Sequence, residues 1–148
     1  MKKLPVLLAT LCFWGCEVHV SEDTEVEFFS MPGTEDMPFS SAVRAGNLLF
    51  LSGAIGVVPG EGLKLAEGGI QGETRQTMDN IQAVLERYGS SLDRVVKCTV
   101  MIADIDEWGA FNEVYVTYFP GPKPARSAFE SSGLAFDARV ELECWAAN

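Results

Sequence analysis

The chain has 148 residues, of which 47% are hydrophobic, and 11 Lys and Arg against 21 Asp and Glu give it a formal net charge of −10. This composition fits one globular domain and argues against disorder, and against nucleic acid as a partner, because phosphates require clustered cations. The chain has 1 histidine, His19, which lies near the N-terminus outside the patterned segments. The sequence therefore argues against a Ser-His-Asp triad and against a metal site with several histidines. We expect a small molecule or another protein as partner, and no metal.

The first sixteen residues resemble the signal of a bacterial lipoprotein. Two lysines precede an apolar run over residues 4–14, which is too short to span a membrane, and Gly15 and Cys16 follow it. A small residue before a Cys that becomes lipidated is the lipobox pattern, although Phe13 and Trp14 depart from it. We therefore expect a signal peptide over residues 1–15, lipidation of Cys16, and an exported, periplasmic or membrane-anchored protein. The alternative is a cytoplasmic protein with a misassigned start codon.

After this leader, we expect an acidic tether and a first strand over residues 16–36 and one folded domain over residues 37–148. Apolar runs bounded by glycine and proline predict strands at 26–29, 41–44 and 47–53, the last two forming a hairpin. The glycine-rich segment 56–72 lacks the residue order of a phosphate-binding loop, which indicates a mobile connection.

The second half of the domain alternates helices and strands. Apolar residues at three- and four-residue steps predict a helix from Glu73 to Tyr88, ended by Gly89, and a second helix from an N-cap at Asp106 to Tyr118. The pattern predicts three further strands, at 94–102, 125–130 and 138–145. Cys98 and Cys144 fall within these strands, where a free Cys usually acts as a small buried hydrophobic residue, and the sequence leaves their redox state open. No paired CxxC spacing indicates zinc.

The last strand alternates strictly between apolar and polar residues. Val140, Leu142 and Cys144 are predicted to point to one face, and Glu141, Glu143 and Trp145 to the other. Two helices can cover only one face of the sheet. The other face mixes charges with a tryptophan, which favours a subunit interface.

The same alternation predicts that Arg126, on the penultimate strand, shares this open face with Glu141 on the last one. One interpretation is a cross-strand ion pair with a structural role. The other is a site in which Arg126 binds a substrate carboxylate in two parallel hydrogen bonds and Glu141 handles water or a proton. The pattern alone leaves both interpretations open.

The segment PARSAFESSGLAFDARVELECWA, over residues 124–146, resembles the C-terminal signature of the RidA/YjgF family. The resemblance extends upstream through VRAGNLLFLSG at 43–53, the segment at 73–108 and FNEVYVTYF at 111–119. It implies an α+β, chorismate-mutase-like fold, in which a mixed β-sheet carries two helices on one face. It also implies a homotrimer with a central barrel and active sites in clefts between subunits.

Family members of the deaminase type hydrolyse reactive 2-enamino and 2-imino acids to 2-oxo acids and ammonia without a cofactor. By this resemblance Arg126 is the carboxylate clamp and Glu141 directs the attacking water, with Asn112 at the cleft and Ser52 and Gly53 lining the pocket. The expected ligand is therefore a small 2-imino or 2-oxo carboxylate.

Two positions depart from the family pattern. Phe39 stands where the family has a pocket tyrosine, and Ala128 where a cysteine is frequent. By the resemblance both are still expected to contact the substrate, Ala128 through its backbone. The loss of the tyrosine hydroxyl and the presence of a leader motivate an alternative function, an exported trimeric protein that binds small carboxylates without turning them over.

Overall fold

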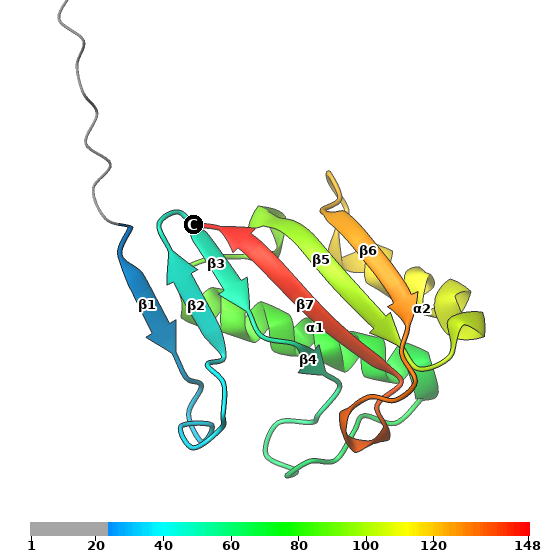
Figure 1. Ribbon diagram of the computed structural model, residues 1–148. Helices are drawn as coiled ribbons and strands as arrows, with labels where there is room; N and C mark the ends of the chain where they lie inside the picture. Colours follow the sequence, from blue (N-terminus) through cyan, green and yellow to red (C-terminus); the bar gives the residue numbers. More distant parts are fainter. Residues whose placement is uncertain (1–23) are drawn as a thin grey trace, which may run out of the picture.

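The computed structural model describes residues 24–148 (Figure 1). The predicted leader, Cys16 and the start of the tether lie outside the described residues. The strands are β1 (Val26–Phe29), β2 (Ala42–Ala45), β3 (Leu48–Leu51), β4 (Ala54–Ile55), β5 (Val95–Ile102), β6 (Ala125–Glu130) and β7 (Val140–Ala147). The helices are α1 (Gly69–Arg87) and α2 (Trp108–Tyr115), and 3-10 turns flank α2 at Ile105–Glu107 and Val116–Tyr118.

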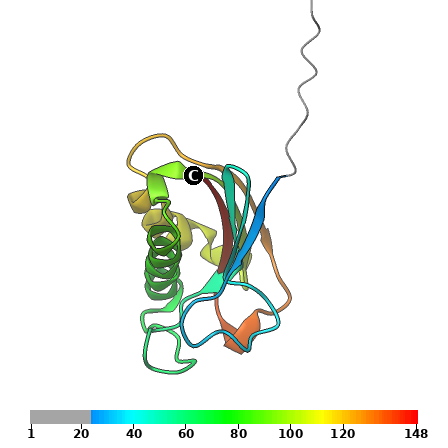
Figure 2. The ribbon, with the colours of Figure 1, turned by 90° about the vertical axis from the view of Figure 1, so that its left-hand side faces the viewer.

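The strands form one mixed sheet with the order β1-β2-β3-β7-β5-β6, and β4 pairs with β7 beside β3. β5 and β6 run parallel, and the other pairs are antiparallel. Both helices pack on one face of the sheet and leave the other face open (Figure 2). The expected fold, a mixed α+β sheet with two helices on one face, is confirmed.

The core lies between the helices and the two central strands, β5 and β7. Val100 on β5 and its partner Leu142 on β7 are both fully buried, and so is Met78 on α1. Along β7, buried and partly exposed residues alternate as the sequence predicts, with Glu141 and Trp145 on the open face. Burial of this one apolar face fixes the register of β7, because a slip by one residue would invert every side chain.

Several element boundaries differ from the predictions. α1 begins at Gly69 rather than Glu73, because Gly68 and Gly69, with φ of 102° and 61°, form the turn into the helix and bring Ile70 into the core. The segment 56–72, expected to be only a connection, contains the first turn of α1 and an isolated β-bridge between Val57 and Leu65, and the short strand β4 precedes it. Asp104, not Asp106, provides the capping carboxylate, which accepts the N–H of Asp106 at 3.0 Å and caps the 3-10 turn that leads into α2.

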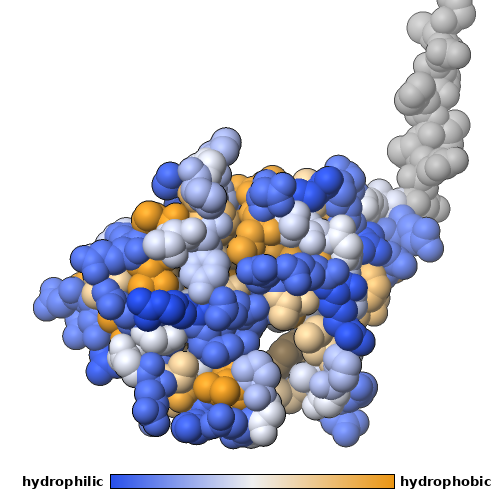
Figure 3. Space-filling view, turned by 180° about the vertical axis from the view of Figure 1, so that it is seen from behind, coloured by the Kyte–Doolittle hydropathy of each residue, from blue (hydrophilic) through white to orange (hydrophobic). Residues whose placement is uncertain are grey.

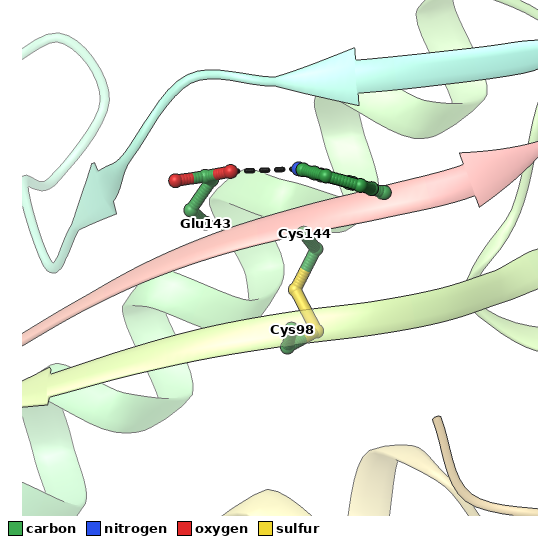
Figure 4. The surroundings of a disulfide bond; sticks show 4 residues. Cys98, Glu143 and Cys144 are labelled. Atoms are coloured by element: carbon green, nitrogen blue, oxygen red, sulfur yellow. Dashed lines mark hydrogen bonds between the residues drawn. A yellow bond between two sulfur atoms is a disulfide. The ribbon is translucent and has the colours of Figure 1, made fainter. Parts of the chain in front are cut away.

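Cys98 and Cys144, whose redox state the sequence leaves open, are joined by a disulfide (Figure 4). The two residues face each other directly in the antiparallel β5–β7 pair, and both are fully buried. Side chains opposite each other on one face of a strand pair are close enough for such a bond. The disulfide therefore ties together the two central strands.

No helix within residues 24–148 is both long and apolar enough to cross a membrane.

Candidate functional site

The predicted site residues form two separate clusters within one chain. β7 lies between β3 and β5, so β5 separates Arg126 on β6 from Glu141 on β7. The strand register places Arg126 on the face of Cys98, which is the helix-covered face, whereas Glu141 lies on the open face with Met101. The expectation that Arg126 and Glu141 share one face is wrong, and a cross-strand ion pair between them is excluded in this chain.

The first cluster holds Arg126 between β6 and α2. Its Nη1 donates a hydrogen bond to Oδ1 of Asn112 at 2.8 Å. The guanidinium carbon lies 5.6 Å from the ring centroids of Trp108 and Phe111 and 4.9 Å from that of Tyr115. One amide and three aromatic rings thus fix the guanidinium, which keeps N–H groups available for an anion.

Sequence reasoning assigned the rings of α2 to the core and did not connect them with Arg126. Their spacing brings three rings to one helix face, and this spacing was the feature of the sequence that could have indicated an aromatic site for Arg126.

Ala128 lies two residues after Arg126 on the same face and packs against the core. The hydroxyl of Tyr115 is buried without a hydrogen-bond partner among residues 24–148, and burial raises the pKa of Tyr115 more than the nearby Arg126 lowers it.

The second cluster is a cavity of about 670 Å³ at the opposite end of the sheet from the C-terminus. Five segments line it: the β1–β2 loop, the segment from the end of β3 to β4, the β4–α1 loop, the β6–β7 loop, and β7 itself through Glu141. Figure 3 shows a hollow with apolar residues around it where these loops lie. Its lining includes Phe39, Ser52, Gly53 and Glu141, so four of the predicted site residues come together here.

Glu141 is the one charged side chain in the lining of this cavity. It forms no salt bridge within residues 24–148. Burial raises the pKa of the Glu141 carboxyl, and the neighbouring charge of Glu143 raises it further. A carboxylate with a raised pKa is suited to accept and return a proton near neutral pH.

Gly53 makes room for this carboxylate. A Cβ at position 53 would overlap Oε1 of Glu141 and would lie 3.0 Å from its carboxyl carbon, so a side chain here would displace Glu141. Ser52 donates from its hydroxyl to the carbonyl of Ser40 at 2.6 Å, which ties the β1–β2 loop to the end of β3. Phe39 contributes an exposed ring and no hydroxyl to the wall.

A metal centre has little support in the described part of the chain, where no three His, Cys, Asp or Glu side chains gather into a group that could hold an ion. The two clusters themselves offer a fixed cation in Arg126 and a carboxylate with a raised pKa in Glu141.

Comparison with known proteins identifies the family. The model of the family described as Endoribonuclease L-PSP matches residues 33–148, so the chain belongs to this family, which is the RidA/YjgF family predicted from the sequence. The chain is 39% identical over 107 residues to Reactive Intermediate Deaminase A, chloroplastic, of Arabidopsis thaliana, covering 72% of this chain and 57% of that one. The match thus spans little more than half of this plant relative.

A mouse relative is named 2-iminobutanoate/2-iminopropanoate deaminase and is 39% identical over 106 residues, covering 72% of this chain and 78% of that one. The crystal structure of E. coli TdcF with bound serine aligns with a TM-score of 0.70 at 29% identity, covering 75% of this chain and 88% of that one. The sequence predicted a deaminase-type hydrolase, and the plant and mouse relatives are both named deaminases.

Proposed function

We propose that this protein hydrolyses reactive 2-imino acids, and the 2-enamino acids that tautomerise to them, to 2-oxo acids and ammonia. The observation that carries the proposal is the pair of clusters: a guanidinium fixed by Asn112 and three rings, and a desolvated carboxylate packed on Gly53. The names of the relatives support the same reaction.

In the proposed reaction, the free N–H groups of Arg126 bind the substrate carboxylate and orient the imine. Glu141 positions a water molecule and accepts a proton as the water oxygen bonds to the imine carbon. The proton then passes to the nitrogen. As the C–N bond breaks and ammonia leaves, the hydroxyl gives its proton back to Glu141 and the carbonyl forms, and Glu141 passes this proton to the departing ammonia. A protonated imine is already electrophilic, so positioning and proton transfer supply the catalysis.

The two clusters can act on one substrate only if different copies of the chain supply them, because within one chain they lie on opposite faces of the sheet. We propose a homotrimer in which Arg126 of one copy faces Glu141 of the next. The open face of the sheet supports such an assembly, since Phe28, Phe129 and Trp145 expose 71%, 49% and 38% of their surface there. A closed ring of copies would cover this apolar face.

Subunit complementation tests both proposals. Arg126→Ala and Glu141→Ala chains are each expected to lose activity on 2-iminopropanoate, generated in situ by an amino-acid oxidase. When the two variants are co-expressed with different tags and mixed trimers are isolated, one of the three sites in each trimer should contain both residues, so about a third of the wild-type activity should return. No recovery in verified mixed trimers would overturn the shared site.

A wild-type protein that binds pyruvate but does not accelerate imine hydrolysis would instead support the alternative function, a carboxylate-binding protein. The phenylalanine at position 39, which brings no hydroxyl to the cavity, is the observation that favours this alternative. RNA cleavage, which the family description suggests, is disfavoured by the net charge of −10.

We also propose that the protein is exported and lipidated at Cys16. The Cys98–Cys144 disulfide supports export, because such bonds persist mainly in oxidising compartments. The intact mass of the protein from its native membrane fraction should equal that of a chain starting at a lipid-modified Cys16, and Cys16→Ser should abolish the modification. A soluble chain that still begins at Met1, with both strand cysteines alkylatable, would contradict export.

A further inference from the structure

The cavity beside Glu141 gathers large apolar side chains from three loops that are distant in sequence. Met37, Phe39, Leu63 and Phe136 expose 45%, 52%, 56% and 55% of their surface, yet all four line the same cavity. Ile55 and Val57 complete the apolar wall. Exposed apolar side chains scattered singly need no explanation, but a convergent group around a cavity indicates a binding surface.

Hydrogen bonds hold each of the three walls. In the β1–β2 loop, the hydroxyl of Thr34 donates to the carbonyl of Met31 at 2.8 Å. In the β4–α1 loop, the N–H of Val58 donates to the carbonyl of Lys64 at 2.9 Å, which forms the turn that presents Leu63. Asn80 on α1 donates to the carbonyls of Ile55 and Val57 at 3.0 and 2.9 Å.

The third wall, the β6–β7 loop, is tied to the rest of the chain at Arg139. Its N–H donates to the carboxylate of Glu73 at 2.8 Å, and its carbonyl accepts the N–H of Ala103 at 2.9 Å. The cavity is therefore formed before a ligand binds, and a ligand does not have to order its walls.

Phe136 occupies its place in this wall with an unfavourable backbone. Its φ is +58° and that of Asp137 is +59°, a region that bulky L-residues rarely adopt. Neither packing in the core nor a need for φ above zero explains a phenylalanine at a half-exposed turn position, where glycine or asparagine would fit with less strain. The ring of Phe136 forms part of the cavity wall, and this contact explains a phenylalanine at the strained position.

The polar groups of the lining are Glu141 and the hydroxyls of Thr34 and Ser52, and no Lys or Arg is among the lining residues. The cavity is thus unsuited to hold the carboxylate of an imino acid, which the proposed function assigns to Arg126. It is suited to hold hydrocarbon next to Glu141.

We infer that this cavity is the side-chain pocket of the enzyme and that it selects 2-imino acids with large apolar side chains, aromatic or branched, over 2-iminopropanoate. This inference rests on the proposed function and names its substrate class. The occupant is the substrate side chain because the cavity is continuous with Glu141, the group proposed to activate water. Met37, Phe39, Leu63 and Phe136 are then specificity residues.

The test compares imino acids generated in situ by an amino-acid oxidase from phenylalanine, leucine and alanine. The kcat/KM for the phenylalanine- and leucine-derived imines should exceed that for the alanine-derived imine by at least ~10-fold, since apolar pockets discriminate by ~10–200-fold per methylene. Phe136→Asn and Leu63→Ala should each reduce this ratio severalfold, mainly through KM for the larger substrates. Asparagine tolerates a positive φ, so Phe136→Asn is expected to fold.

Val116→Ala is the matched control, because Val116 is an apolar residue with 43% of its surface exposed on the turn after α2, outside the cavity lining. It should leave the substrate ratio unchanged. Equal kcat/KM for all three imines would overturn the inference while leaving the proposed function intact.

No acceleration with any imine would overturn the proposed function itself. In that case, calorimetry with phenylpyruvate and pyruvate still tests the pocket, which requires tighter binding of phenylpyruvate. If Phe136→Asn or Leu63→Ala changed the native mass of the protein and left the substrate ratio as it was, another copy of the chain would occupy the cavity, and the inference would be wrong.

Discussion

The two clusters of the proposed site differ in the surroundings of their charged group. Arg126 lies against a helix and a sheet, with an amide oxygen 2.8 Å away and three aromatic rings around the guanidinium. Glu141 lies in a cavity built mostly by loops, without an ion-pair partner within residues 24–148 and next to a glycine. One cluster fixes a permanent cation for binding, and the other destabilises an anion so that it can accept a proton.

These two environments are difficult to combine in one place. A carboxylate placed next to Arg126 would pair with it, which would lower the pKa of the carboxyl and occupy the cation. Opposite faces of the sheet keep the groups apart within one chain, and assembly of copies would bring them together across a substrate. Separation within the chain thus preserves the separate properties of the two groups.

The largest effect is expected from Glu141→Gln, which keeps the shape of the side chain beside Gly53 but removes the proton acceptor. The kcat/KM should fall by ~10²–10⁴-fold, the range for loss of general acid–base catalysis. Since burial raises the pKa of Glu141 above its usual 4.5, the wild-type activity should decline on the acid side at a higher pH than an ordinary glutamate would give. The pH profile of kcat/KM measures both effects.

Glu143→Gln is the matched control for that experiment. The charge of Glu143 raises the pKa of Glu141, whereas its carboxylate accepts the indole N–H of Trp145 at 2.6 Å, a bond that the glutamine oxygen can also accept (Figure 4). The decline of kcat/KM on the acid side should therefore move to lower pH in Glu143→Gln, and the maximal kcat/KM should stay unchanged. An acid limb that persists unchanged in Glu141→Gln would show that another group titrates.

Arg126→Lys tests the binding cluster. Lysine keeps the charge but loses the planar fork, and with it the simultaneous contacts to Asn112 and to a carboxylate. A charge-assisted hydrogen bond contributes about 1.5–3 kcal/mol, so kcat/KM should fall by ~10–100-fold, mainly through a higher KM.

Arg44→Lys serves as the control for this substitution. Arg44 also lies over an aromatic ring, 5.0 Å from the centroid of Phe29, and it bonds to Glu27 at 2.7 Å, far from either cluster. Its substitution should leave the Michaelis constant unchanged. A loss confined to kcat in Arg126→Lys would contradict a binding role for Arg126.

The sequence predicted the elements well and their pairing poorly, for physical reasons. Alternation along β7 is a local property, so the faces of Val140, Leu142 and Glu141 were correct. The registers of β6 and β7 against β5 depend on long-range pairing that no local pattern contains, which is why the assignment of Arg126 and Glu141 to one face was wrong.

The same reason applies to the disulfide and to the cavity. Cys98 and Cys144 are 46 residues apart, and only the β5–β7 register places them opposite each other. The family resemblance supplied Phe39, Ser52, Gly53 and Glu141, which the structure brings to one cavity. The sequence did not indicate Phe136 as a cavity residue, because the evidence for it lies in its backbone conformation and its neighbours, and neither is visible in the sequence.

The smallest effect is expected from Tyr115→Phe, which asks whether the Arg126 cluster contributes more than one donor. The Tyr115 hydroxyl is buried without a partner among residues 24–148, and the ring alone provides the contact with Arg126. Removing an unpaired buried hydroxyl should raise the free energy of unfolding by about 1 kcal/mol, measured by denaturant titration, and change kcat/KM by less than ~3-fold.

Tyr118→Phe provides the contrast, because the Tyr118 hydroxyl donates to Asp79 at 2.8 Å, and its loss should destabilise the fold by about 1 kcal/mol. A fall of kcat/KM by ~10-fold or more in Tyr115→Phe, with stability retained, would mean that this hydroxyl donates to the substrate carboxylate beside Arg126, and the binding cluster would then have two donors instead of one.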